Sequence, residues 1–315
     1  MTRLALAVDL GGTKVEAALV GEDGTVVAQS RTQRPTGRRA TPDDVTAGID
    51  EAIGGALRHL GDDRLIGAGV GAAGPMNLQT QAVSPVNMRG LVQYPIGDAV
   101  SRHVPGLPVT VRLDGTCIAL AEQLFGAARG SRHSLSMVVS TGVGGGIVSG
   151  GRLLAGATGN AGHLGQVRLR GPRIDAEGDG TGNGMGDGTV EAIASGPASV
   201  AWAVARGWHG ATGEDLARDV ATGDAVATAA VRRSAAAVGE AIAIVSTLLD
   251  LQVAVVAGGF VNVTPDYLDL VRAGVRDAAV LEYAAAVRVE PSGLSGTGPL
   301  AGAAALVLRP DLLAD

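Results

Sequence analysis

The sequence predicts an α/β protein built from two domains. The main indication is an approximate internal duplication, in which Leu4–Val20 and Leu135–Ser149 each read as an apolar strand, a glycine-rich turn and a return strand. Helical segments and further apolar strands alternate after each of these openings. The length of 315 residues is sufficient for two domains of ordinary size. Two such domains facing each other would leave a cleft as the default ligand site.

The first half is expected to form a hairpin-rich opening followed by alternating helices and strands. Its turns are Gly11-Gly12 and Glu22–Gly24, where glycine allows positive φ. A helix capped near Asp43 is expected because apolar residues recur after it at the spacing of one helix face. The expected strands are Leu4–Leu10, Val15–Val20, Val26–Ser30, Ile66–Gly71 and Val109–Arg112, and the expected helices run from Asp43 to Leu60 and over Gly115–Phe125.

The second half is expected to repeat this plan and to end in a helix. The expected strands are Leu135–Ser140, Ile147–Ser149, Val253–Val256 and Val287–Val289, and the expected helices are Ala225–Leu249 and a last one from Pro299. The Gly- and Asp-rich stretch Gly171–Gly188 is expected to be a solvated loop. Its carboxylates Asp175, Glu177 and Asp179 do not complete a calcium loop, because Gly186 stands where the twelfth-position Glu is needed. We place the domains at residues 1–114, completed by a helix at 297–315, and 115–296.

Composition narrows the class of protein. Hydrophobic residues make up 46% and aromatic residues 2%, so the core must be built from Ala, Val, Leu and Ile. No apolar run approaches the ~20 residues that span a bilayer, and the N-terminus lacks a secretion signal. The single Cys117 fits a reducing cytoplasm. A net charge of −6 leaves no electrostatic footprint for nucleic acid. We therefore expect a cytoplasmic protein with neither a nucleic-acid nor a membrane partner.

Lys14 is the only lysine in the chain and closes the segment Asp9-Leu10-Gly11-Gly12-Thr13-Lys14. An ammonium on a flexible stem suits a phosphate tail, and glycines let backbone N–H groups approach one closely. An ordinary β-turn that contains a lysine is the alternative interpretation. Neither this turn nor Thr141–Gly146 matches the dinucleotide or P-loop patterns. Two turns in corresponding places could still clamp a polyphosphate from both sides.

The two turns, with Asp9 leading the first and Ala257-Gly258-Gly259 far downstream, are typical of the sugar kinase, heat-shock ATPase and actin superfamily. The chain resembles the ROK family of bacterial glucokinase-type sugar kinases over essentially its full length. The matching stretches are Asp9–Val20, Gly71–Pro75, Asp114, Thr141–Ile147, Asn160–Gly162, Glu191–Gly196 and Ala257–Gly259.

This resemblance implies an actin-like, ribonuclease-H-like sugar kinase fold of two domains, with the last helix packed on the first domain. It also implies ATP and Mg²⁺ as cofactors and a homodimer. By resemblance Asp114 is the catalytic base, although Asp114 could instead simply cap the helix beginning at Gly115. The residues implied in nucleotide binding are Asp9 (for Mg²⁺, through water), Gly11, Gly12, Thr13, Lys14, Thr141, Gly142, Gly144 and Gly145, with Gly258 and Gly259 facing the adenosine.

The resemblance places the sugar contacts at Gly74, Asn87, Asp114, Asn160, His163, Gln166 and Glu191. The chain departs from the family pattern at several of the neighbouring positions. Leu113 replaces an Asn before the catalytic Asp, and His163-Leu164-Gly165-Gln166 replaces Glu-x-Gly-His. The cysteine-rich zinc loop is absent too, so no zinc site is expected. His163 could instead be a core-facing or surface imidazole that contacts no ligand.

Altered partners in the pocket predict an altered acceptor. We therefore expect a modified hexose-like substrate, such as an amino sugar like kanosamine or a cyclitol. The alternatives are an ordinary glucokinase without zinc, a non-catalytic sugar-binding protein and a sugar-responsive regulator. A regulator is disfavoured because the motif at Asp9 leaves no room before it for a helix-turn-helix domain. Polyphosphate in place of ATP ranks low, because no run of Lys or Arg flanks the motifs.

Overall fold

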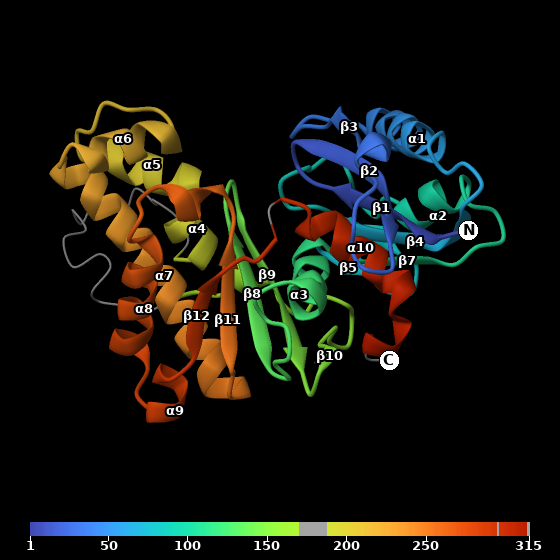
Figure 1. The fold of residues 1–315 in the computed structure, drawn as a ribbon. Coiled ribbons are helices and arrows are strands. Elements are labelled where there is room, and N and C mark those ends of the chain that lie inside the picture. The colour runs from blue at the N-terminus through green and yellow to red at the C-terminus, as the bar shows by residue number, and fades with distance from the viewer. Residues whose placement is uncertain (170–187, 295, 314–315) are drawn as a thin grey trace. The chain divides into compact units, whose positions relative to one another are not determined.

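The computed structural model describes residues 1–169, 188–294 and 296–313 (Figure 1). The loop expected at Gly171–Gly188 lies, apart from Gly188, outside the described residues, and so do Asp175, Glu177 and Asp179. The chain forms two compact units. Unit 1 comprises Met1–Arg132, Gly146–Gly162 and Gly293–Asp315, and unit 2 comprises His133–Gly145 and His163–Ser292.

Two five-stranded sheets have the same order of strands. The first runs β3-β2-β1-β4-β7 and the second β10-β9-β8-β11-β12, so the internal duplication is confirmed. In the first sheet β1 is antiparallel to β2 and parallel to β4, and in the second β8 is parallel to β11. The strands of the first sheet are β1 (Arg3–Leu10), β2 (Lys14–Gly21), β3 (Thr32–Pro35), β4 (Arg64–Ala72) and β7 (Val109–Leu113). Those of the second are β8 (Ser134–Val139), β9 (Val143–Ser149), β10 (Arg152–Leu153), β11 (Val253–Ala257) and β12 (Arg288–Pro291).

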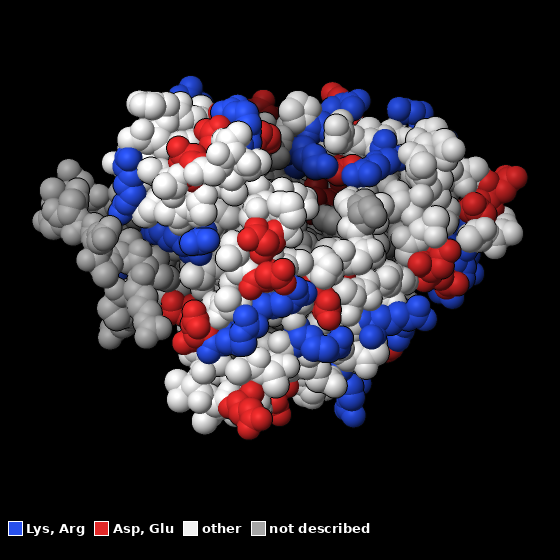
Figure 2. Space-filling view, turned by 60° about the vertical axis from the view of Figure 1, so that its left-hand side comes forward, with Lys and Arg blue, Asp and Glu red and all other residues white. Residues whose placement is uncertain are grey.

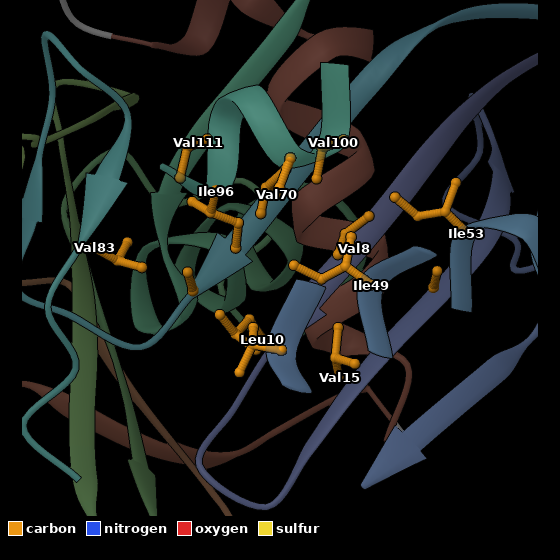
Figure 3. Packing of buried hydrophobic residues seen from close by; sticks show 14 of the residues in the cluster. Val8, Leu10, Val15, Ile49, Ile53, Val70, Val83, Ile96, Val100 and Val111 are labelled. Carbon is orange, nitrogen blue, oxygen red and sulfur yellow. The ribbon is translucent and has the colours of Figure 1, made fainter. Parts of the chain in front are cut away.

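Helices cover both faces of the first sheet, which explains why β1 is apolar at almost every position. Leu6, Val8 and Leu10 pack in one core with α1 (Pro42–Leu57) and α2 (Ile96–Ser101) (Figure 3). The alternate residues Ala5 and Ala7 pack on the other face with α3 (Asp114–Phe125) and α10 (Gly298–Leu308). A small hairpin, β5 (Met76–Asn77) and β6 (Ala82–Val83), adds to unit 1.

The helices of unit 2 centre on the long helix α7 (Ala225–Leu249), which begins and ends where the sequence predicted. It packs closely on α8 (Tyr267–Ala278), because Gly239 brings the two backbones together. The remaining helices of this unit are α4 (Val190–Ala194), α5 (Gly196–Val204), α6 (Gly213–Ala221) and α9 (Glu282–Ala285). Among the described residues, the search for a helix with the length and apolarity needed to span a membrane finds none.

The prediction of a strand at Val26–Ser30 is wrong. Only Val26 pairs, with Val20, and Ala28–Ser30 is a 3₁₀ turn before β3 begins at Thr32. The reason lies in Ser30, whose hydroxyl accepts a hydrogen bond from Leu19 N at 2.9 Å and donates one to Val27 O at 2.7 Å. A side-chain hydroxyl thus replaces a backbone hydrogen bond of the sheet, and the chain turns here and does not continue as a strand.

The first compact unit extends past residue 114, where the sequence suggested a domain boundary, because α3 packs on α10 at backbone distance. A Cβ atom on Gly302 of α10 would lie 1.8 Å from Cys117 O in α3. Gly69 of β4 lets α10 approach the sheet equally closely, since a Cβ atom on Gly69 would lie 1.7 Å from Ala303 O. Neither site has room for even one methyl group.

We expect Gly302→Ala to destabilise the protein by about 1–3 kcal/mol or more, because the new methyl group must push α10 off α3. The matched control is Gly54→Ala in α1, where a Cβ meets no atom within 4 Å and alanine should stabilise the helix by roughly 0.5–1 kcal/mol. Urea unfolding of both variants measures the difference. Equal stability of the two variants would contradict the packing described here.

Candidate active site

Two acidic residues of unit 1 come close to each other at the carboxyl ends of strands β1 and β7. Asp9 is the penultimate residue of β1 and pairs with Gly71 of β4, and Asp114 is the first residue of α3. A Cβ atom on Gly71 would lie 3.5 Å from Asp9 Oδ1, 3.6 Å from Asp114 Cα and 3.1 Å from Cys117 Sγ. The absent side chain of Gly71 therefore lets the start of α3 come down beside Asp9.

The proximity of these acids changes the pKa of Asp9. Burial, followed by the negative charges of Asp114 and Glu16, raises the pKa of Asp9 from 3.8 to about 7, against an opposing contribution from Lys14. Burial also raises the pKa of the Cys117 thiol well above its usual range, so this cysteine is a packing residue and not a nucleophile. The site thus has a surplus of negative charge that the protein only partly compensates.

Asp114 does not cap α3 in the usual way. Its Oδ1 accepts a hydrogen bond from the adjacent Gly115 N at 2.7 Å, whereas an N-cap side chain binds the amide two or three residues on. The helix begins at Asp114 itself, with Leu113 in the N-cap position and no side-chain cap bond. Asp114 therefore stands one position inside the helix from its N-cap, and its roles as a base or as a cap both stay predictions.

The first glycine turn joins β1 to β2. Gly11 N donates to Lys14 O at 2.9 Å, and the Thr36 hydroxyl donates to Gly11 O at 2.9 Å. Asn87 lies against this turn, since a Cβ on Gly12 would be 2.4 Å from Asn87 Nδ2. The structure therefore brings a predicted sugar contact, Asn87, directly against predicted phosphate-binding residues.

Asn160 holds a neighbouring segment of unit 1. Its Oδ1 accepts from Met76 N at 2.8 Å, and its Nδ2 donates to Met76 O at 2.7 Å. The same segment contains Gly74, whose carbonyl accepts from Val86 N at 3.1 Å, next to Asn87. Through these hydrogen bonds Asn160 fixes the backbone at Met76. Its role in binding a sugar stays a prediction.

The second glycine turn, in unit 2, is bound by Glu191. The Oε2 of this residue, in the first turn of α4, accepts a hydrogen bond from Val143 N at 2.8 Å, and a Cβ on Gly142 would lie 2.6 Å from the same oxygen. His163 and Gln166 flank a 3₁₀ turn whose Gly165 packs on Val143 O. The carboxylate of Glu191 thus lies on the glycine turn, and its contact with a sugar stays a prediction.

A pocket of about 570 Å³ opens beside this turn within unit 2. Its walls are mostly apolar and come from α5, α6 and the segment after β11, with Glu214 and Asn262 as polar members. Thr141 and Gly259 line this pocket, whereas Gly258 is not part of its lining, and the role of all three in nucleotide binding stays a prediction. Gly258 has φ +106°, and its Cβ would lie 2.2 Å from Val139 O, so only glycine fits there.

The sequence reasoning missed several residues of these two sites. In unit 2 it missed the apolar wall of the pocket, including Val200, Ala217 and Phe260. In unit 1 it missed Glu16, a buried carboxylate bonded to Lys14 and Arg31. The signal for Glu16 was present, because an acid in the otherwise apolar strand Lys14–Gly21 needs a partner. Within the described ranges, no group of three or more His, Cys, Asp and Glu side chains that could hold a metal is found.

We expect Asp9→Asn to stabilise the protein more at pH 8 than at pH 5. The folded-state pKa of Asp9 is raised to about 7, so its contribution to stability is present below the unfolded value of 3.8 and is lost as the pH rises towards 7. The loss amounts to at most about 1.4 kcal/mol per pH unit.

Thermal unfolding of both proteins at pH 5, 6, 7 and 8, without nucleotide or divalent cations, measures this difference. Asp62→Asn, which removes an exposed carboxylate of the same unit, is the matched control. A difference between Asp9→Asn and wild type that does not vary with pH would contradict the raised pKa.

The fold and the motifs match one family across the chain. A sequence profile of the ROK family matches residues 5–310. An N-acetylmannosamine kinase of Escherichia fergusonii is 34% identical over 266 residues, which cover 84% of this chain and 86% of the relative. The structure resembles a ROK hexokinase from Thermus thermophilus at 30% identity and a TM-score of 0.80, covering 98% of this chain and 99% of the other. A ROK family glucokinase from Streptomyces griseus, in complex with glucose and AMPPNP, is 28% identical with a TM-score of 0.79, covering 96% and 99%. The fold is the actin-like, ribonuclease-H-like fold that the sequence predicted, and the chain belongs to the ROK family.

Proposed function

We propose that this protein transfers the terminal phosphoryl group of ATP to a hydroxyl of an amino sugar. That it is a sugar kinase using ATP rests on the full-length family match and on relatives that are sugar kinases, one of them in complex with an ATP analogue. The observation that carries the catalytic assignment is the meeting of Asp9 and Asp114 at Gly71.

Phosphoryl transfer depends mainly on positioning and on stabilisation of charge, with one carboxylate to take the proton of the attacking hydroxyl. Asp114 suits that task, because it is an acid at the start of α3 whose backbone comes close to the position of Asp9 at Gly71. In the proposed reaction Asp114 accepts the proton while the sugar oxygen attacks the phosphorus.

The residues present fit a magnesium ion. Two neighbouring carboxylates supply the hard oxygen ligands that Mg²⁺ prefers, and the raised pKa of Asp9 indicates negative charge that a cation would relieve. Asp9 would hold the ion, through water. When bound, Mg²⁺ would neutralise charge on the donor phosphates.

The pocket in unit 2 fits a nucleotide donor better than a polyphosphate. Its apolar walls can bury a purine base, which polyphosphate lacks. Thr141 and the amides of the second glycine turn would bind phosphate, although the Val143 amide is already bonded to Glu191. On the face shown in Figure 2, basic and acidic residues among those described are interspersed and form no long basic track for a polyanion.

An amino sugar is the acceptor that the side chains and the relatives favour together. Leu113, where an Asn was expected by resemblance, packs in the core at 3% exposure and offers no polar contact to a sugar. Gln166 is exposed and His163 half-buried, so both can reach a ligand. An imidazole can donate a hydrogen bond as well as accept one, unlike the carboxylate it replaces. The relative from Escherichia fergusonii is named for an amino sugar, N-acetylmannosamine.

The homodimer and the cytoplasmic location are further parts of the proposal. They are carried by the family resemblance and by the single, buried Cys117. Sedimentation velocity and cell fractionation would test them.

We expect Asp114→Asn to fold normally and to lose about 10²–10⁴-fold in kcat, because the amide cannot accept the proton. Sugar-dependent ADP formation measures the loss, with nucleotide binding as a check on folding. Asp98→Asn, at an exposed acid of α2 in the same unit, is the control. Retention of more than about a tenth of wild-type kcat would remove Asp114 from the role of base.

We expect kcat/KM for glucose to be at least ~30-fold below that of the best amino sugar, because each missing polar partner costs about 1–3 kcal/mol. The panel should contain N-acetylmannosamine, a 3-amino hexose, a cyclitol and glucose. The double variant His163→Glu/Gln166→His should move the preference towards glucose. If glucose is the best acceptor of the wild-type enzyme, the protein is an ordinary glucokinase and the argument from the pocket is wrong.

A further inference from the structure

Glu16 lies at the centre of a three-residue ionic cluster next to the first glycine turn. Its Oε2 accepts a hydrogen bond from Lys14 Nζ at 2.6 Å, and its Oε1 accepts one from Arg31 Nε. The side chain of Glu16 is only 5% exposed, whereas those of Lys14 and Arg31 are 41% and 39% exposed. A buried acid therefore holds two cations whose outer parts face solvent.

The cluster shares a face of the sheet with the candidate catalytic acids. Glu16 of β2 stands directly opposite Asp9 of β1, and Lys14 is two residues from Glu16 on the same side of its strand. Lys14 lies diagonally across the strand pair from Asp9, on the same face, so Asp9 is a second carboxylate within reach of this long side chain.

Stability alone does not account for the cluster. Ion pairs with exposed members contribute little because solvent screens them, and a buried acid recovers its desolvation cost only when its partners are well placed. What the arrangement does achieve is a defined position for a long, flexible side chain. A free lysine stem would otherwise lose rotamer entropy each time it bound a phosphate.

We propose that Glu16, itself held by Arg31, is a positioning residue that keeps the Lys14 ammonium beside the first glycine turn and away from Asp9, ready for the donor phosphates. Arg31 also reaches Gly296 O, at 3.5 Å, and so links the cluster to the segment before α10. The proposal rests on the proposed function, because it assigns Lys14 to the phosphates of ATP.

Kinetics of Glu16→Gln test the proposal. We expect kcat/KM for ATP to fall about tenfold, since positioning is lost in the transition state, with a change of no more than about twofold in KM for the sugar. Arg31→Met should lower kcat/KM for ATP in the same direction but less, because Glu16 keeps its bond to Lys14. The matched controls are Glu51→Gln and Arg34→Met, which break the surface pair Arg34–Glu51 on the neighbouring strand β3 and helix α1; neither should change the kinetics.

A double-mutant cycle separates positioning from a structural role. If Glu16 acts through Lys14, Glu16→Gln should add less than about a twofold loss in a Lys14→Met background. A structural role predicts the same loss in both backgrounds and would overturn the proposal. Unchanged or increased kcat/KM for ATP in Glu16→Gln would overturn it as well.

The single lysine provides a direct readout that does not depend on turnover. Protein labelled with ¹³Cε-lysine has one lysine signal in its NMR spectrum. We expect that signal to move on addition of ADP, and to move towards its position in the unfolded chain in Glu16→Gln but not in Glu51→Gln. A Lys14 signal that is insensitive to Glu16→Gln contradicts the proposal. Failure of the proposed function looks different, because the wild-type protein would then form no ADP with any sugar.

Discussion

The approach of α3 and α10 to the middle of the first sheet is the constraint on which the candidate active site depends. Gly69 and Gly302 remove the side chains that would hold α10 away from β4 and α3, and Gly71 does the same for the start of α3. Asp114 reaches Asp9 only because these three positions carry no Cβ. Packing at backbone distance is rigid, so it holds the two carboxylates in place without help from a ligand.

This packing has an electrostatic consequence. Asp9, with Asp114 and Glu16 nearby, has a pKa raised to about 7, so the folded protein is less stable when all these acids are ionised. Lys14 and Arg31 offset part of this charge. Both bond to Glu16, and Lys14 also lowers the pKa of Asp9 directly. Strain of this kind is common where a protein keeps groups ready for a ligand, because the ligand relieves it. In the proposed reaction a cation and the donor phosphates would complete the charge balance.

The two sheets share one strand order, but different residues surround the glycine turn in each. In the first sheet the strand before the glycine turn carries an acid, Asp9, one residue before its end, and another acid follows β7. In the second sheet the turn carries no acid of its own, and Glu191 reaches it from α4. An apolar pocket opens beside that second turn. The same framework thus supplies a carboxylate site in one unit and the proposed nucleotide pocket in the other.

The sequence by itself determined the repeated strand, glycine turn and return strand of the two halves, the long helix Ala225–Leu249 and the positions of both glycine turns, because periodicity and turn residues are local signals. Tertiary structure decided the rest. The Ser30 side chain replaced a ladder bond and removed an expected strand, and Glu16 gained two cationic partners that strand periodicity could not reveal. The pocket wall draws on helices and a loop far apart in the chain. Which side chains meet at such distances depends on how closely the backbones pack, and that follows only from the folded molecule.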